Sequence, residues 1–357
     1  MKEKVMIAMS GGVDSSVCAL LLKEQGYACH GAMMQLLNSL GSALCPKVID
    51  ASPSEAQKAA VIAEKLEIPF TLLNLSEEFR QHVVDYFVKT YESGGTPNPC
   101  VQCNKTMKFG ALLEAADKHG CAKIATGHYA RIRRDASGRY CLLRAKDLSK
   151  DQSYVLWQLS QEQLSRTLFP LGEMTKAEIR SIAEKNGFCN ATQKDSQDIC
   201  FIPDGDYVGF LERYTQKEYP AGDFLSTDGR VLGRHNGHIR YTVGQRKGLG
   251  IALGKPTYVC KKDVEANTVT VGENEDLFSR ELTATHINLI AVEHLDSPLR
   301  VEAKIRYGAL PAPATAEQIA PNRLRVVFDQ PQRAITSGQS VVLYQGDTVI
   351  GGGIIES

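Results

Sequence analysis

Short apolar runs alternate with segments of helical periodicity along the first third of the chain. Four runs are expected to form strands: Val5–Met9, Tyr27–Gln35, Phe70–Leu75 and Cys121–Gly127. Four segments with apolar residues three or four positions apart are expected to form helices: Ser15–Gln25, Ser54–Glu67, Glu77–Tyr91 and Met107–Lys118. Strands that alternate with helices predict βαβ units and a doubly wound parallel sheet of the α/β class. Ligands bind such sheets at the carboxyl ends of strands, so functional residues are expected just after Met9, Gln35 and Thr126.

Helix start signals occur at two places in this part of the chain. Ser54 and Gln57 have the spacing of a capping box, in which each side chain bonds the backbone of the other. Thr175 and Glu178 repeat that spacing within residues 152–190, a region whose pattern predicts helix.

The pattern changes to short strands and turns from Asp204 onward. Thr257–Lys262 and Thr268–Gly272 flank a turn and predict a hairpin. From Thr283 to the end, β-branched runs alternate with Pro and Gly turns, which is typical of a small β-barrel or sandwich. Boundaries near 203 and 275 therefore predict three domains: 1–203, 204–274 and 275–357.

The composition is that of an ordinary globular protein. The 357 residues include 41 Lys and Arg against 41 Asp and Glu, and 43% are hydrophobic, which excludes disordered and collagen-like chains. No apolar run approaches the roughly 18–20 residues that span a bilayer. The start of the chain turns to Ser-Gly-Gly too early for a signal peptide, so we expect a soluble, cytoplasmic protein.

Positive charge is concentrated in two stretches. Arg230–Lys262 contains eight Lys or Arg and no Asp or Glu, and Arg131–Ser153 contains seven basic residues against three acidic ones. Either stretch alone could be a solvated face. Two of them favour a polyanionic partner, because phosphate contacts need only local positive charge.

The ten cysteines of a long chain in a reducing compartment do not predict a disulfide framework. Five lie in apolar stretches and are expected to be packing residues: Cys18, Cys29, Cys121, Cys141 and Cys260. Two have no assignment: Cys45 and Cys189. Three lie in Pro- and Asp-rich segments and are candidates for chemistry: Cys100, Cys103 and Cys200.

The segment Ser10–Ser16, Ser-Gly-Gly-Val-Asp-Ser-Ser, follows the first strand and opens the first helix. Its glycines allow close approach to a phosphate, and the helix start supplies free N–H groups and a positive dipole end. Asp14 would repel phosphate, so its presence implies bound Mg²⁺ or a catalytic requirement. The alternative is an ordinary Gly-Gly turn. No Walker pattern occurs, and Gly248–Lys255 is interpreted as a basic loop.

The segment Thr96–Lys105 contains two prolines and is expected to be an extended, rigid loop before a helix. Cys103 would lie near that helix start, beside Lys105 and Lys108, which predicts a lowered thiol pKa and a thiolate nucleophile. Cys-x-x-Cys alone is ambiguous between zinc, a redox pair and structural thiols, and no second such pair completes a zinc site.

Several motifs together resemble a known family. Ser-Gly-Gly-Val-Asp-Ser resembles the pyrophosphate loop of the N-type ATP pyrophosphatases, which is also found in asparagine, GMP and NAD synthetases. From residue 5 to Ile355 the chain resembles the bacterial tRNA-specific 2-thiouridylases. The motifs that support this narrower resemblance are Pro97–Lys105, Ala125–Tyr129, Lys150–Tyr154, Asp195–Ile202 and Tyr241–Gly250.

The resemblance implies a reaction and an organisation. ATP adenylates the C2 carbonyl oxygen of the wobble uridine in tRNAs that read Lys, Glu and Gln codons, releasing pyrophosphate. A cysteine persulfide then supplies sulfur, giving 2-thiouridine and AMP. Mg²⁺ and a sulfur donor, either a cysteine desulfurase or a persulfide relay protein, are implied as well. The first domain would be catalytic with a helical tRNA-contacting insertion, the second small and basic, and the third a β-barrel.

The resemblance also implies roles for individual residues. Cys103 would be the nucleophile and Cys200 the persulfide carrier. The phosphates of ATP would be held by Ala8, Met9, Ser10, Gly11, Gly12, Val13, Asp14 and Ser15, and the adenosine by Met34 and Gly127. The target base would be contacted by Asn98, Pro99 and Cys100. Other parts of the tRNA would be contacted by His128, Lys150, Asp151, Gln152, Arg306, Tyr307 and Gln339.

The chain departs from the family pattern at Cys100, where many members have an Asp with an acid/base role. A thiol moves protons less readily at neutral pH, which leaves that role open here. Cys100, Cys103 and Cys200 could alternatively hold an iron–sulfur cluster, although persulfide chemistry is favoured. Two other functions are less favoured. An amide-forming synthetase with the same loop would need neither reactive cysteines nor a basic β-rich tail. A catalytically inactive RNA-binding protein of the same fold would not need Asp14 or the candidate cysteines.

Overall fold

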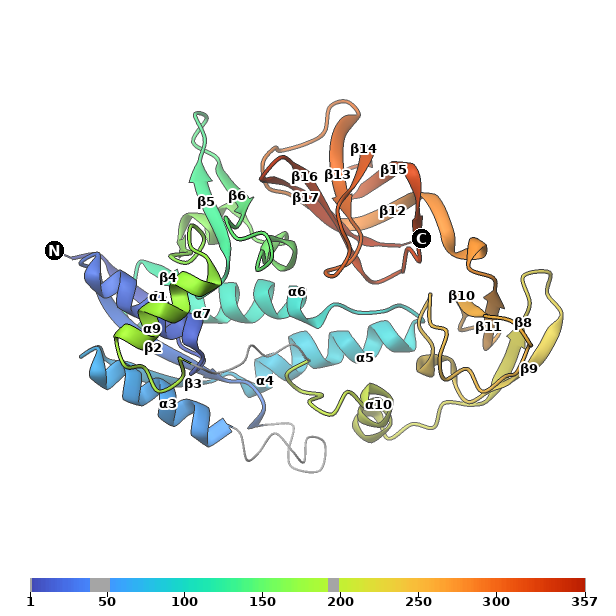
Figure 1. Ribbon diagram of the computed structural model, residues 1–357, viewed down its shortest axis with the longest axis horizontal. Helices are drawn as coiled ribbons and strands as arrows, with labels where there is room; N and C mark the ends of the chain where they lie inside the picture. The colour runs from blue at the N-terminus through green and yellow to red at the C-terminus, as the bar shows by residue number, and fades with distance from the viewer. Residues whose placement is uncertain (1, 39–51, 192–198, 357) are drawn as a thin grey trace. The chain divides into compact units, whose positions relative to one another are not determined.

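The computed structural model describes residues 2–38, 52–191 and 199–356 (Figure 1). The chain forms two compact units. The first comprises Met1–Val84, Pro99–Gly205 and Gly346–Val349, and the second comprises Asp85–Asn98, Asp206–Gln345 and Ile350–Ser357. The division into three domains at 203 and 275 stays a prediction.

The first unit is built on a five-stranded sheet in the order β3-β2-β1-β4-β7. Every neighbouring pair is parallel, so each connection must cross over the sheet. The strands are β1 (Lys4–Ala8), β2 (Ala28–Gln35), β3 (Phe70–Asn74), β4 (Lys123–Ala125) and β7 (Thr167–Leu168). The predicted doubly wound α/β class is confirmed, with β1 at the centre of the sheet.

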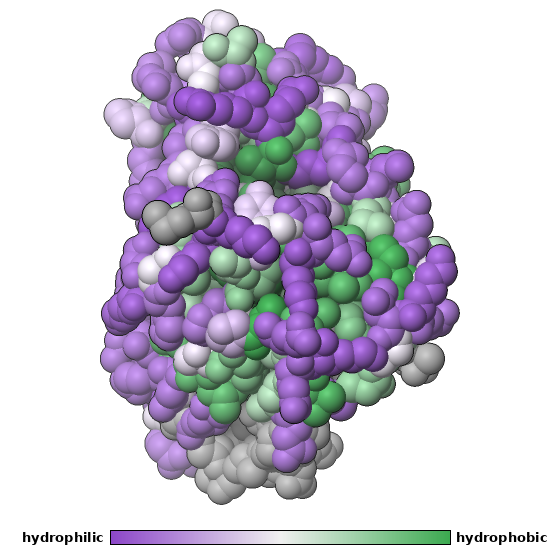
Figure 2. All heavy atoms as spheres, turned by 90° about the vertical axis from the view of Figure 1, so that its left-hand side faces the viewer, coloured by the Kyte–Doolittle hydropathy of each residue, from purple (hydrophilic) through white to green (hydrophobic). Residues whose placement is uncertain are grey.

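Helix α1 (Val13–Glu24) lies in the core of this unit. Most of its residues are buried, because it packs against the sheet and against α9 (Lys176–Lys185). Side chains of α3 (Ser52–Lys65) complete the same apolar cluster. On the face in Figure 2 hydrophilic side chains predominate and apolar ones form smaller areas between them. Because α1 is packed against the sheet and against α9, the first turn of α1 is held in place.

The second predicted capping box is confirmed and the first is wrong. Thr175 caps α9: its Oγ1 accepts from the Glu178 N–H, and the Glu178 carboxylate accepts from the Thr175 N–H. Helix α3 already begins at Ser52, so Ser54 lies inside it and cannot be its cap. Pro53 explains the earlier start, since proline is favoured in the first turn, where its missing N–H has no cost.

Two predicted helices contain π-helical turns. The segment predicted at 77–91 consists of α4 (Ser76–Phe79), η2 (Arg80–Val84) and α5 (Asp85–Glu92). The one predicted at 107–118 starts earlier, as α6 (Pro99–Cys103), η3 (Asn104–Ala111) and α7 (Leu112–Lys118). The extended loop expected up to Lys105 is therefore wrong from Pro99 onward, because a proline also fits the first turn of a helix.

The region 152–190 is only partly helical. It contains η4 (Ser153–Leu156), α8 (Gln161–Ser165) and α9, but also the short edge strand β7. Before it, β5 (Ala130–Arg134) and β6 (Tyr140–Arg144) form an antiparallel hairpin.

The second unit contains α5, α10 (Tyr207–Thr215), the short 3-10 helix η5 (His238–Arg240) and two sheets. The smaller sheet has the order β10-β11-β8-β9. Its strands are β8 (Gly222–Leu225), β9 (Val231–His235), β10 (Tyr258–Asp263) and β11 (Thr268–Gly272). The predicted hairpin is β10 with β11 and is confirmed.

The predicted barrel is also confirmed. Six strands follow the order β12-β15-β14-β13-β16-β17, and β12 pairs back with β17 to close the barrel. They are β12 (Phe278–Leu289), β13 (Leu299–Lys304), β14 (Ala312–Ala320), β15 (Arg323–Arg333), β16 (Ser340–Gln345) and β17 (Thr348–Ile355). A Cβ at Gly351 would lie 2.3 Å from the backbone oxygen of Asn288, which explains a glycine where β12 and β17 meet.

Candidate active site

The loop after β1 has the conformation that its glycines predict. β1 ends at Ala8 and α1 begins at Val13, so Met9–Gly12 form the connection. Gly11 has a φ of +79°, and a Cβ there would lie 2.7 Å from the backbone oxygen of Glu55. A side chain at this position is excluded both by conformation and by the close approach of α3.

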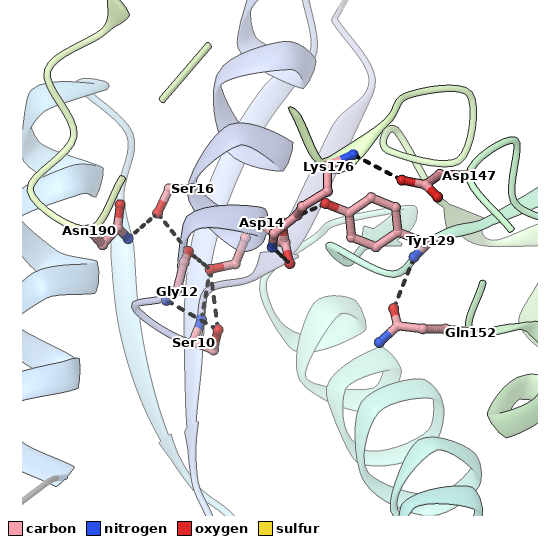
Figure 3. A network of polar contacts seen from close by, with 10 residues as sticks. Ser10, Gly12, Asp14, Ser16, Tyr129, Asp147, Gln152, Lys176 and Asn190 are labelled. Carbon is pink, nitrogen blue, oxygen red and sulfur yellow. Dashed lines mark hydrogen bonds and ion pairs between the residues drawn. The ribbon is translucent and has the colours of Figure 1, made fainter. Parts of the chain in front are cut away.

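Two backbone N–H groups of this loop make long hydrogen bonds to serine hydroxyl oxygens (Figure 3). The Gly12 N–H donates to Ser10 Oγ over 3.4 Å, and the Ser10 N–H donates to Ser15 Oγ over 3.2 Å. The Ser15 and Ser16 hydroxyls donate to the Gly12 carbonyl at 2.9 and 3.0 Å. The carbonyl is thus satisfied within the protein, whereas the weakly bonded N–H groups at the start of α1 suit the oxygens of an anion.

The predicted convergence of strand ends is observed. β4 and β2 both pair with β1, which brings Gly127 and Met34 to the same end of the sheet. A Cβ at Gly127 would lie 2.9 Å from the carbonyl carbon of Asp14 and 3.0 Å from the Ser15 nitrogen. Only a glycine therefore lets this turn lie against the start of α1.

Asp14 is bound by two residues for which the sequence predicted no such contact: Lys176, and Tyr129 at the end of the motif Ala125–Tyr129. The Lys176 ammonium lies 2.8 Å from each Asp14 carboxylate oxygen, and the Tyr129 hydroxyl donates to Oδ1 at 2.8 Å (Figure 3). The Lys176 backbone N–H donates to Asp147 at 3.2 Å. Lys176 is only 8% exposed. A mostly buried ammonium therefore lies beside the loop that would receive phosphates.

Asn190, beyond the end of α9, also reaches the loop. Its Nδ2 donates to the Gly11 carbonyl at 2.6 Å and to Ser16 Oγ at 3.0 Å. Its side chain is buried, and its Oδ1 has no hydrogen-bond partner among residues 2–38, 52–191 and 199–356. Neither Lys176 nor Asn190 carries a motif that would have identified it.

The three candidate thiols belong to the first unit. Cys100 and Cys103 lie on α6, one turn apart, and Cys200 follows at a distant point of the chain. They are close enough for the charges of Cys100 and Cys103 to raise the pKa of Cys200. Phe201 packs edge-to-face on Phe79 with ring centroids 5.7 Å apart, which anchors the chain beside Cys200.

The predicted lowering of the Cys103 pKa is wrong. Loss of hydration raises the pKa of the Cys103 thiol to about 11 and outweighs the opposing attraction of the Lys108 ammonium. The same effect, with the charges of Cys103 and Cys100 added, raises the pKa of Cys200 to about 12. Without ligands both are therefore protonated thiols at neutral pH.

The remaining cysteines follow the prediction in part. Four of the expected packing residues are buried: Cys18, Cys29, Cys121 and Cys141. Cys260 is only half-buried, Cys189 is exposed, and Cys45 lies outside the described residues. Within residues 2–38, 52–191 and 199–356 no group of three or more His, Cys, Asp or Glu side chains could hold a metal ion.

The predicted tRNA-contacting residues of the first unit also have structural contacts. The His128 ring is buried and its Nδ1 lies 2.7 Å from Thr126 Oγ1; burial holds its pKa well below the usual range. Gln152 accepts from the Tyr129 N–H at 3.0 Å, and Asp151 accepts from the Ser153 hydroxyl at 2.8 Å. Lys150 is half-buried next to them, and Pro99 is buried at the start of α6.

The other predicted tRNA contacts belong to the second unit. Gln339 donates to the carbonyls of Thr96 and Pro97, at 3.0 and 3.1 Å, and so orders the backbone before Asn98. On the barrel, Arg306 donates to the Arg333 carbonyl at 3.1 Å, and Tyr307 is 48% exposed.

The basic stretch 230–262 is partly neutralised by acids outside it. Four of its residues form ion pairs: Arg230 with Asp228, Arg234 with Asp223, Arg240 with Glu212, and Lys255 with Glu273. Burial lowers the pKa of Lys262 to about 8. Arg246 and Lys247 are exposed. The net positive charge that this stretch offers to a partner is therefore smaller than the sequence suggests. The two neighbouring cations Arg246 and Lys247 contribute to it.

Comparison with known proteins agrees with this architecture. Residues 3–204 match the family model of a tRNA methyl transferase HUP domain. Residues 208–273 match a tRNA methyl transferase PRC-barrel domain, and residues 279–355 match an aminomethyltransferase β-barrel domain. Fold and site thus define a protein with a nucleotide-binding-type α/β domain followed by two β domains.

Curated relatives match along the whole chain. The tRNA-specific 2-thiouridylase MnmA of Clostridioides difficile (strain 630) is 47% identical over 362 residues, which cover 100% of this chain and 99% of the relative. The tRNA-specific 2-thiouridylase MnmA of Clostridium perfringens (strain 13) is 48% identical over 356 residues, 100% of this chain and 99% of the relative. The chain belongs to the tRNA-specific 2-thiouridylase family.

Among solved structures, a 4-thiouridine synthetase–RNA complex with bound ATP is similar over 59% of this chain and 50% of that chain, with 18% identity and a TM-score of 0.32. This likeness is too distant to bear on function.

Proposed function

We propose that this chain is a tRNA-uridine 2-sulfurtransferase that makes 2-thiouridine at the wobble position with ATP. The observation that supports this most strongly is that one compact unit contains two features. One is a loop suited to binding phosphates, with Asp14 at its end, and the other is a pair of neighbouring thiols, Cys103 and Cys200. A methyl transfer, which the names of the family models mention, would use neither feature.

ATP is the first substrate. Residues Ala8–Ser15 bind its phosphates through the N–H groups and hydroxyls at the start of α1, and Met34 and Gly127 contact the adenosine. Pyrophosphate leaves when the uridine C2 oxygen attacks the α-phosphorus. The loop donors and Lys176 stabilise the charge that develops on the departing pyrophosphate, since preorganised donors act most strongly where charge appears in the transition state.

Asp14 fits a role in holding Mg²⁺ together with ATP. Its side chain is 29% exposed, and Mg²⁺ is commonly held by one or two carboxylates plus substrate phosphates. The cation would neutralise phosphate charge. Lys176, whose ammonium lies 2.8 Å from the Asp14 carboxylate oxygens, would add positive charge beside the same phosphates.

Adenylation turns the C2 oxygen into a leaving group, which makes an otherwise unreactive carbonyl susceptible to sulfur. The terminal sulfur of a Cys200 persulfide attacks C2 and AMP departs. The Cys103 thiolate then attacks Cys200 Sγ, which leaves sulfur on C2 and forms a Cys103–Cys200 disulfide that an external thiol reduces. Because both thiols have raised pKa values, deprotonation of Cys103 is a step that bound substrate must assist.

An iron–sulfur cluster on Cys100, Cys103 and Cys200 is the less favoured alternative as sulfur carrier. Within the described part of the chain these three residues are not arranged as a metal site. We therefore assign Cys100 to the target-base pocket together with Asn98 and Pro99, in the place where many relatives have Asp.

The proposed substrates are tRNAs that read Lys, Glu and Gln codons. They would be positioned by His128, Lys150, Asp151, Gln152, Arg306, Tyr307 and Gln339. The sulfur donor would be a cysteine desulfurase or a persulfide relay protein. A cytoplasmic location follows from the proposed action on tRNA. No helix in the described residues has the length and apolar character needed to cross a membrane.

Variants of the cysteines test this proposal. Cys200→Ser should still convert ATP to AMP on tRNA but form no 2-thiouridine, because a hydroxyl cannot carry sulfane sulfur. Cys103→Ser should accept sulfur on Cys200 without releasing it. Cys189→Ser, at an exposed cysteine outside the proposed site, is the matched control. Full 2-thiouridine formation by Cys200→Ser would refute the persulfide assignment.

A further inference from the structure

The residue types at Gly11 and Gly12 do not by themselves fix the orientation of the peptide between them. Gly11 lies at a positive φ, and neither glycine has a side chain to restrict rotation of the peptide between them. In one orientation its N–H faces the phosphate site. In the flipped orientation its carbonyl oxygen would face the site and repel an anion. A hydrogen bond that holds the Gly11 carbonyl oxygen away from the phosphate site would favour the first orientation.

Asn190 makes that contact. Its Nδ2 binds the Gly11 carbonyl oxygen at 2.6 Å (Figure 3 shows Asn190 beside Ser16 and Gly12). The C=O and N–H of a planar trans peptide point in opposite directions, so a carbonyl held by Asn190 turns the Gly12 N–H the other way. There it meets Ser10 Oγ over 3.4 Å, a long bond that a phosphate oxygen can replace.

The second hydrogen of the same amide fixes the next peptide. Asn190 Nδ2 also donates to Ser16 Oγ at 3.0 Å, and that hydroxyl donates to the Gly12 carbonyl at 3.0 Å. Both glycine carbonyls are therefore held away from the loop opening, one directly and one through Ser16. The Asn190 side chain is 2% exposed, so water does not compete for these bonds.

We propose that Asn190 is a positioning residue for ATP: it holds the Gly11–Gly12 peptide so that the Gly12 N–H faces the phosphates. The role in adenylation rests on the proposed function, whereas the effect on ATP binding does not. Asn190 acts through the glycine backbone and touches no reacting atom.

The test compares Asn190→Asp and Asn190→Ala with Asn186→Ala. Aspartate keeps the size of asparagine and removes both donors. Asn186 is the matched control: it caps the end of α9, and its Nδ2 donates to the Ile182 carbonyl of that helix, away from the loop. Calorimetric titration with ATP, without tRNA, should show at least about tenfold weaker binding for both Asn190 variants and wild-type binding for Asn186→Ala.

A positioning role also predicts a kinetic pattern. AMP formation on tRNA should lose kcat as well as affinity, because the Gly12 N–H bonds more strongly to the departing pyrophosphate than to ATP. The unfolding temperatures should stay close to that of Asn186→Ala. Wild-type ATP affinity in a folded Asn190 variant overturns the proposal, and so does failure of both variants to fold.

The two proposals fail separately. If the Asn190 variants bind ATP more weakly than the wild-type chain but the wild-type chain makes no 2-thiouridine, the proposed function is wrong and the positioning role stands. If 2-thiouridine is made and ATP binding does not depend on Asn190, only the positioning role is wrong.

Discussion

Replacing Lys176 with methionine removes the ammonium that binds Asp14 and keeps most of the aliphatic side chain. The Lys176 side chain is 10% exposed and that of Asp14 is 29% exposed, so their ion pair is mostly withdrawn from water. Breaking a fully buried pair costs about 3–5 kcal/mol, and an exposed pair contributes about 0–1 kcal/mol. Between these limits, we expect Lys176→Met to lower the free energy of unfolding by about 2 kcal/mol.

The same substitution should also slow adenylation, and its effect on the activation free energy should exceed its effect on the free energy of unfolding. Loss of one preorganised charge-stabilising group typically reduces the rate by about 10²–10³-fold. Asp14→Ala should show a similar loss in ATP-to-AMP turnover while the fold is retained. Because the two changes remove one ion pair, the double variant should be more stable than the sum of the single effects predicts, by about 1–2 kcal/mol.

Chemical denaturation and tRNA-dependent AMP formation are the two assays. Lys185→Met is the control, since Lys185 is exposed on the last turn of the same helix. The reasoning would be refuted if Lys176→Met matched this control in both assays, or if the stability effects of Lys176→Met and Asp14→Ala were simply additive.

Three further predictions concern tRNA and the thiols. Replacing Arg246 and Lys247 together by alanine should weaken tRNA binding and reduce its salt dependence by roughly one to two counterions, whereas an unchanged salt slope would show a merely solvated face. Cys100→Asp should retain or increase 2-thiouridine formation; joint loss of activity and iron after anaerobic reconstitution would instead support a cluster. The sulfur-release step, measured in single turnover, should accelerate as pH rises from 7 toward the Cys103 pKa of about 11, because the thiolate fraction increases; a rate independent of pH would contradict this.

The sequence predicts those features that depend on local pattern. The parallel sheet, the barrel, the Thr175 capping box and the Ser-Gly-Gly turn each have a short signature in periodicity or residue type. The π-helical turns at Arg80–Val84 and Asn104–Ala111 have none, because segments of 5 and 8 residues are too short for their spacing of apolar residues to be told apart from that of an α-helix.

Long-range contacts and burial account for the rest. Lys176 is 162 residues from Asp14, and Asn190 is 179 residues from Gly11, so only the folded chain shows them as partners. The Cys103 pKa was predicted in the wrong direction because its neighbours in sequence are basic, whereas the loss of hydration that dominates comes from the tertiary structure. Charge along Arg230–Lys262 was overestimated for the same reason, since the acids that neutralise it lie outside that stretch.

The most direct test of the account is mass spectrometry of tRNA nucleosides after incubation of the chain with unmodified tRNA, ATP, Mg²⁺, cysteine and a cysteine desulfurase. We predict 2-thiouridine at the wobble position of tRNAs that read Lys, Glu and Gln codons, together with AMP and pyrophosphate. Omission of ATP, or the Cys200→Ser variant, should abolish it. ATP-independent formation of 2-thiouridine, or a modification other than thiolation, would contradict the account.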